Sequence, residues 1–229
     1  MDDASRPAGE AQAVRVDVGG VALDGSLGVP ERAFGVVLFV HGGESGSRRS
    51  RDDYVAEQLR RGGLATLQVD LAAADDAPDE PQADGARLDV ELLARRAMGA
   101  CDWLISQSPT RELPIGLFGA SAGAAVALAA AAERPDLVGA VVSRGGRPDL
   151  AGLALPRVKA PTLLIVGGSD YPVISLNRDA LQYMSCERSL EVVPGATHLF
   201  EEAGALESVA RLSGDWFRRY LAGDRSRER

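Results

Sequence analysis

Short runs of apolar, β-branched residues alternate along the chain with longer segments in which apolar residues recur at helical spacing. This alternation predicts an α/β domain, with a mostly parallel sheet covered by helices on both faces. Two apolar runs near the start, separated by Gly19 and Gly20, predict an antiparallel hairpin. The expected strands are residues 14–18, 21–29, 35–40, 64–70, 114–118, 138–143, 161–166 and 189–193, and the expected helices are residues 52–61, 88–106, 122–133, 175–185 and 206–221.

No linker rich in proline, glycine and serine divides the chain, so we expect one domain over residues 13–222. Residues 1–12 and the charged tail 223–229 are expected to be mobile. Residues 72–84, rich in alanine, aspartate, glutamate and proline, are expected to form a loop over the strand ends. That loop is the only evident lid, because no long insertion predicts a cap domain.

Composition narrows the choice of partners. A formal net charge of -8 over 229 residues argues against nucleic acid, which requires clustered arginine and lysine. The first ten residues do not resemble a secretory signal, and the longest apolar stretch, residues 124–132, is too short to span a membrane. We therefore expect a cytoplasmic protein without a membrane anchor, in which Cys101 and Cys186 are ordinary reduced thiols.

The strongest chemical signal is the segment Gly119-Ala120-Ser121-Ala122-Gly123, which follows a predicted strand and opens an alanine-rich predicted helix. A strand-to-helix turn this tight strains the serine backbone and requires small neighbours. It also holds the hydroxyl at a helix N-terminus, where developing negative charge is favoured. The segment therefore predicts Ser121 as a nucleophile.

A serine hydroxyl needs a base, and the chain has only two histidines, His41 and His198. His198 follows the last predicted strand, where a loop can bring the imidazole over Ser121, so we interpret it as the general base. Asp170 follows the strand at 161–166 and is predicted to orient that imidazole. The order Ser121, Asp170, His198 is the one expected of an α/β-hydrolase. Asp149, after the preceding strand, is the alternative acid.

An acyl-transfer site also needs donors for the oxyanion. The backbone N–H of Ala122, next to the nucleophile, is one candidate. The second should come from the loop after the strand at 35–40, in which Gly43 is the first choice and Glu44 the second. Glycines in that loop allow the backbone to approach a substrate closely.

These motifs carry a resemblance to a known family. His41-Gly42-Gly43, the Ser121 segment, Gly168-Ser169-Asp170 and Gly195-Ala196-Thr197-His198 resemble the dienelactone-hydrolase-like branch of the α/β-hydrolase superfamily, over residues 14–221. Dienelactone hydrolases proper use a cysteine where this chain has Ser121, which leaves cleavage of an ester, lactone or thioester. The resemblance implies that neither a metal nor an organic cofactor is needed. Some proteins of this type also carry a phosphoribosyltransferase domain, and none is expected within these residues.

Arg144 follows the strand at 138–143, so it is expected on the same sheet edge as the three catalytic candidates. A guanidinium near the nucleophile could bind a substrate carboxylate through two hydrogen bonds. The alternatives are an ion pair with one of the many acidic side chains, or a solvated surface position. The expected partner of the protein is a small ester-type molecule, and the chain is expected to be a monomer or a homodimer.

The sequence also bears on three other classes of function: dinucleotide binding, nucleotide binding by a P-loop, and non-catalytic binding. Gly116, Gly119 and Gly123 superficially resemble a dinucleotide-binding turn, but that turn should follow the first strand of a βαβ unit. No Gly-Lys-Ser/Thr sequence exists, which excludes a P-loop.

The more serious alternative is a catalytically silent hydrolase fold that serves as a binding or interaction module, because fold does not fix function. The presence of all three catalytic candidates in order favours the hydrolase.

Overall fold

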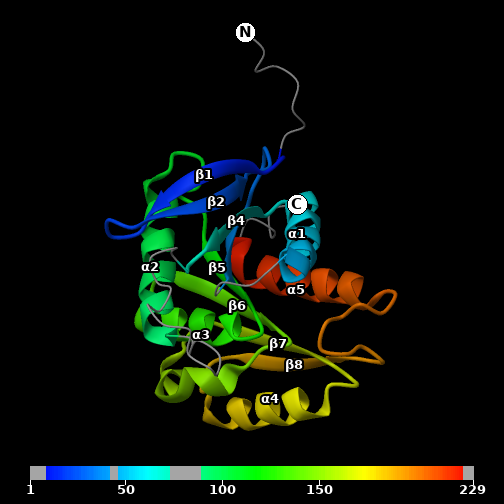
Figure 1. Ribbon diagram of the computed structural model, residues 1–229. Coiled ribbons are helices and arrows are strands. Elements are labelled where there is room, and N and C mark those ends of the chain that lie inside the picture. Colours follow the sequence, from blue (N-terminus) through cyan, green and yellow to red (C-terminus); the bar gives the residue numbers. More distant parts are fainter. Residues whose placement is uncertain (1–8, 42–45, 73–88, 224–229) are drawn as a thin grey trace, which may run out of the picture.

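The central sheet of the computed structural model, which describes residues 9–41, 46–72 and 89–223, has eight strands within those ranges (Figure 1). Their spatial order is β1-β2-β4-β3-β5-β6-β7-β8. β2 is antiparallel to both β1 and β4, and all other neighbours are parallel. The strands are β1 (Gln12–Asp17), β2 (Ala22–Gly28), β3 (Val36–His41), β4 (Ala65–Asp70), β5 (Ile115–Ala120), β6 (Val138–Arg144), β7 (Thr162–Gly167) and β8 (Arg188–Val193).

Helices cover both faces of this sheet. They are α1 (Gly46–Arg61), α2 (Val90–Ser106), α3 (Gly123–Glu133), α4 (Tyr171–Tyr183) and α5 (Ala205–Leu221), with a 3₁₀ segment η2 (Pro148–Arg157). α1 and α5 pack together on one face, and α2 and α3 pack together on the other (Figure 1). Every residue of β5 is consequently buried, as expected for a parallel strand covered on both sides. The α/β-hydrolase architecture expected from the sequence is confirmed.

The N-terminal hairpin depends on its two glycines. The turn between β1 and β2 places Gly19 at φ 70° and Gly20 at φ 92°, a backbone region that side-chain-bearing residues avoid. The Gly20 N–H donates to the Asp17 carboxylate at 2.9 Å, and the Val18 N–H donates to the Val21 carbonyl at 2.9 Å. This turn sets the register that joins β1 to the sheet.

The structure corrects the expected limits of the later helices. α4 begins at Tyr171, not at residue 175, because Pro172 lies in its first turn, where a missing N–H costs nothing. Helix η2 was not expected, because Pro148 and Pro156 and a left-handed Gly152 interrupt any α-helical pattern there. Of the segments expected to be mobile, 1–12 and 223–229, residues 1–8 and 224–229 lie outside the described residues, and so does the expected lid at 72–84 beyond its first residue. No helix in the described ranges is both long and apolar enough to cross a membrane.

Candidate active site

The catalytic candidates lie at the carboxyl ends of parallel strands, which meet at one edge of the sheet. Ser121 directly follows β5, Asp170 follows β7 after a short turn, and His198 follows β8. Three separate strand-to-loop connections therefore supply one site.

The backbone turn at Ser121 is strained and tightly packed. Ser121 has φ 50°, one of two non-glycine residues with positive φ in the described ranges. A Cβ atom on Gly119 would lie 2.5 Å from the Gly123 carbonyl oxygen, and one on Gly123 would lie 2.5 Å from the Val40 carbonyl oxygen. These positions leave no room for a side chain, so the small residues around Ser121 are a steric requirement of the turn.

The loop after β6 holds the backbone of Ser121 on both sides. The Ser121 N–H donates to the Arg144 carbonyl at 3.1 Å, and the Ser121 carbonyl accepts from the Arg147 N–H at 2.9 Å. Strained backbone conformations persist only where the surroundings determine them. These two bonds, with the close helix packing, keep the serine in its unusual conformation.

His198 and Asp170 form a hydrogen-bonded pair. His198 Nδ1 lies 2.7 Å from Asp170 Oδ2; the Asp170 side chain is 11% exposed and the His198 side chain 38%. The Ser169 N–H donates to the Ala196 carbonyl at 2.9 Å, which ties the two loops together. A carboxylate in this position selects the imidazole tautomer with its proton on Nδ1 and leaves Nε2 to act as a base.

Ser121 and His198 line a common small cavity of about 10 Å³. Its other lining residues are Arg51, Arg144, Gly145 and Leu199. The nucleophile and base candidates therefore face the same space, with two guanidinium-bearing residues around it.

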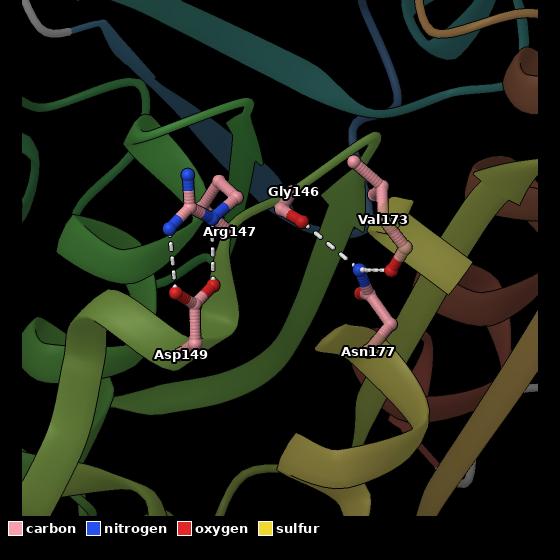
Figure 2. A network of polar contacts seen from close by, with 5 residues as sticks. All are labelled: Gly146, Arg147, Asp149, Val173 and Asn177. Carbon is pink, nitrogen blue, oxygen red and sulfur yellow. Dashed lines mark hydrogen bonds and ion pairs between the residues drawn. The ribbon is translucent and has the colours of Figure 1, made fainter. Parts of the chain in front are cut away.

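The alternative acid, Asp149, has a different partner. Both of its carboxylate oxygens accept from the Arg147 guanidinium, at 2.8 and 2.7 Å (Figure 2). This bidentate hydrogen bond holds the pKa of the Asp149 carboxyl below its ordinary value. The imidazole of His198 is paired with Asp170, and Asp149 instead secures the loop that holds Ser121.

Asn177 secures the same loop from the side of α4. Its buried amide nitrogen donates to the Gly146 carbonyl at 2.9 Å and to the Val173 carbonyl at 2.8 Å (Figure 2). The Gly146 bond joins positions 31 residues apart. Sequence reasoning missed Asn177, and no local pattern signals such a long-range contact.

Arg144 is buried, with its side chain 6% exposed, and forms an ion pair with Asp52 at 2.8 Å. An ion pair of this kind was the alternative that the sequence left open beside a substrate clamp. The same aspartate lies 3.3 Å from His41 Nδ1. The sequence gives no signal for the role of Asp52. The chain has 33 acidic residues, and no motif around Asp52 distinguishes it from the others.

Of the oxyanion-hole candidates, Ala122 lies at the N-cap of α3, where backbone N–H groups lack helical partners. Gly43 and Glu44 fall outside the described residues. No group of three or more His, Cys, Asp or Glu side chains that could hold a metal ion occurs in the part of the chain that the structure describes.

The sheet topology and the serine turn at the head of α3 define the α/β-hydrolase class of proteins. The chain belongs to one family within that class: the sequence profile of the "Dienelactone hydrolase family" matches residues 23–219. A crystal structure of dienelactone hydrolase from Anabaena variabilis is 52% identical and superposes with a TM-score of 0.87, covering 94% of this chain and all of that one. The resemblance seen in the sequence is thus confirmed, and family and neighbour support a hydrolase.

Two further similarities extend this comparison. Est1E from Butyrivibrio proteoclasticus shares the fold with a TM-score of 0.73 at 18% identity, covering 90% of this chain and 98% of that one. A Mycobacterium tuberculosis protein named "Putative phosphoribosyl transferase Rv0571c" is 49% identical over 223 residues, which are 97% of this chain and 49% of that protein. The chain therefore spans about half the length of this curated relative.

Proposed function

We propose that the protein hydrolyses small carboxylic esters, lactones or thioesters through an acyl-enzyme on Ser121. The observation that carries the proposal is the His198–Asp170 pair at 2.7 Å, beside a serine held at φ 50° at the head of α3. A nucleophile, a base and a group that orients the base are the parts that acyl transfer requires.

In the first half of the reaction, Ser121 Oγ attacks the carbonyl carbon while His198 Nε2 accepts the hydroxyl proton. The resulting oxyanion accepts hydrogen bonds from backbone N–H groups, for which Ala122 and Gly43, with Glu44 as the second choice, are the proposed donors. The C–O or C–S bond then breaks, and His198 gives its proton to the departing alkoxide or thiolate.

In the second half, a water molecule attacks the acyl-enzyme and gives a proton to the same histidine. The bond from the carbonyl carbon to Ser121 Oγ breaks, His198 returns the proton to the serine, and the carboxylic acid leaves. Asp170 stabilises the imidazolium at both stages and remains ionised throughout. The cycle closes without a metal or redox partner.

The test is hydrolysis of p-nitrophenyl esters from acetate to decanoate by the wild-type protein and by Ser121→Ala. We expect turnover of the short esters and a loss of at least about a thousandfold in kcat for the variant, because a triad acts as a unit. The chain length with the highest kcat/KM measures the depth of the pocket.

A fluorophosphonate probe separates this proposal from the alternative of a silent binding module. Labelling of the wild-type protein that disappears in Ser121→Ala supports an activated serine. Ser208→Ala is the matched control, because it removes a half-buried serine on α5, and it should label normally. A folded protein that neither labels nor turns over any ester would contradict the hydrolase. The relative's phosphoribosyl transferase name describes a protein about twice as long, and no feature of this site favours that reaction.

A further inference from the structure

Asp52 connects the two strand ends that flank the nucleophile strand. It lies on α1, its side chain is 1% exposed, and its two carboxylate oxygens have different partners. One oxygen is 2.8 Å from Arg144 at the end of β6, and the other is 3.3 Å from His41 at the end of β3.

The strand register places this carboxylate close to Ser121. β5 lies between β3 and β6 in the sheet. Ala120 on β5 is paired with Arg144 on β6, and Val40 on β3 is paired with Gly119. His41 follows Val40, so His41, Ala120 and Arg144 lie at the same level of three adjacent strands, one residue before the nucleophile. The carboxylate of Asp52 therefore contacts the residues on both sides of β5 at the level of Ala120, one residue before Ser121.

The pairing has an electrostatic consequence for the catalytic cavity. Arg144 lines that cavity with Ser121 and His198, and its guanidinium is charged at any working pH. A carboxylate held against it in a region shielded from water offsets most of that charge, because screening by solvent and salt is weak there. Without the carboxylate, the positive charge would act on any substrate bound at Ser121.

The second arginine of the cavity is paired differently. Arg51 donates to Glu201 at 2.9 Å, and the Glu201 side chain is 63% exposed. Ion pairs with an exposed partner are screened and worth little. A carboxylate thus pairs with each arginine of the cavity: Asp52 with Arg144 in a buried setting, and Glu201 with Arg51 at the surface.

We propose that Asp52 is a specificity-determining residue, which neutralises Arg144 beneath the catalytic serine and so disfavours anionic acyl groups relative to uncharged ones. The inference rests on the proposed ester hydrolysis and adds the class of acyl group that the site accepts. The carboxylate also fixes the guanidinium in place, so Arg144 is held as a structural cation and is not offered to the substrate.

The experiment compares two substrates that differ only in charge, mono-p-nitrophenyl adipate and its methyl ester, after subtraction of spontaneous hydrolysis. The quantity is the ratio of kcat/KM for the anionic ester to kcat/KM for the neutral ester. In Asp52→Asn we expect this ratio to rise about tenfold, which corresponds to about 1.4 kcal/mol. In the double variant Asp52→Asn/Arg144→Gln, which removes both charges, it should return to within about threefold of wild type.

Glu201→Gln is the matched control, because it removes a carboxylate from the other arginine at the surface. We expect its ratio to stay within about threefold of wild type. An unchanged ratio in folded Asp52→Asn would overturn the proposal, and so would a larger change in Glu201→Gln than in Asp52→Asn. A double variant that loses the anionic ester selectively would show instead that Arg144 binds the substrate carboxylate.

Removing one partner of a buried ion pair is strongly destabilising, so Asp52→Asn could fail to fold. Arg144→Gln then tests the same charge pair by removing its positive partner. The unopposed Asp52 carboxylate should lower the ratio of kcat/KM for the anionic ester to that for the neutral ester about tenfold. If Arg144→Gln also unfolds, the ratio measured in the double variant decides, since a selective loss of the anionic ester there overturns the proposal. Wild-type protein that hydrolyses neither these two esters nor any other p-nitrophenyl ester, and does not react with the fluorophosphonate probe, would overturn the proposed function itself. Hydrolysis with a ratio that is unaltered in Asp52→Asn would overturn only the role of Asp52.

Discussion

Gly119 shows how strictly the residue type is determined at single positions around Ser121, the proposed nucleophile. Its missing side chain lets β5 run directly beneath the first turn of α3, with the Gly123 carbonyl oxygen 2.5 Å and the Ala124 Cα 2.7 Å from where a Cβ would lie. Both contacts are with backbone atoms, which have no rotamer to change. Even one methyl group would therefore move the helix that positions Ser121.

We expect Gly119→Ala to lower the free energy of unfolding by about 1–3 kcal/mol, the range typical of overpacked sites. It should also reduce kcat of the proposed ester hydrolysis by at least about tenfold, because the N–H of Ala122, the proposed oxyanion donor, shifts with the start of α3. Urea unfolding and p-nitrophenyl ester kinetics on the same preparation measure the two effects.

Gly214 on α5 is the control for this substitution. The nearest atom to a Cβ there is the end of the Leu59 side chain at 3.6 Å, an ordinary contact. Gly214→Ala should be neutral or stabilise the helix by up to about 1 kcal/mol, with kcat unchanged. Equal kinetic effects at the two glycines would contradict the steric account of the turn.

At the scale of elements, α4 connects two parts of the site. It begins directly after Asp170, and about two turns further on Asn177 holds the Gly146 carbonyl in the loop that bonds to Ser121. The positions of Asp170 and Ser121, the proposed acid and nucleophile, are therefore linked through one helix. Short, buried hydrogen bonds of this kind are expensive to remove because their carbonyl partners stay buried.

Asn177→Ala is expected to destabilise the protein by about 1–3 kcal/mol and to lower kcat more than it changes KM. The larger effect on kcat than on KM is the informative part of the result, because displacement of Ser121, the proposed nucleophile, would slow the chemical step while leaving the pocket walls intact. Steady-state kinetics with a short p-nitrophenyl ester, combined with thermal unfolding, measures both.

Ser185→Ala is a suitable comparison, since Ser185 also donates to a distant backbone carbonyl, that of Pro156 at 3.3 Å, but is exposed. Its effect on stability should be within about 0.5 kcal/mol. A normal kcat in a folded Asn177→Ala protein would disprove the coupling through α4.

The strands and helices were predictable from the sequence where the pattern of apolar and turn residues that defines them is local. All expected strands occur, because each is a short apolar run bounded by turn residues. The segment around Ser121 is recognisable because the serine and its two glycines lie within five consecutive residues. The contacts of Asp52 and Asn177 were not predictable, since each joins segments that only the folded sheet brings together. The start of α4 was missed because a proline in a first turn looks, in sequence alone, like a break.

At the scale of the whole molecule, the two cysteines report on the packing of the core. Both are free and buried; Cys101 on α2 is fully enclosed by one of the two main apolar clusters. Burial raises the pKa of the Cys101 thiol to about 12 and also raises the pKa of Cys186. Only the thiolate is reactive, so these groups should be inert while the fold is intact.

We expect Ellman's reagent at pH 8 to modify neither cysteine in the native protein and both in guanidinium chloride. The thiolate fraction of a thiol rises with pH, but pH 9 still lies below the raised pKa of Cys101. The reactivity of Cys101 in the native protein should therefore stay low even near pH 9. The labelling rate across a denaturant series should follow the loss of circular dichroism, because exposure of Cys101 requires the core to open. Rapid native labelling of a Cys186→Ser variant would contradict the burial of Cys101.

The loop between β6 and η2 has a consequence for protein engineering. The Arg144 carbonyl at the end of β6 and the Arg147 N–H at the end of the loop both bond to the backbone of Ser121, and Asn177 holds the Gly146 carbonyl between them. A change in the length of this segment would therefore displace Ser121. Libraries that insert or delete residues there should be almost entirely inactive. Substitutions that aim to change substrate preference are therefore better made at Arg51 and Leu199, whose side chains line the cavity and do not hold the backbone of Ser121 in place.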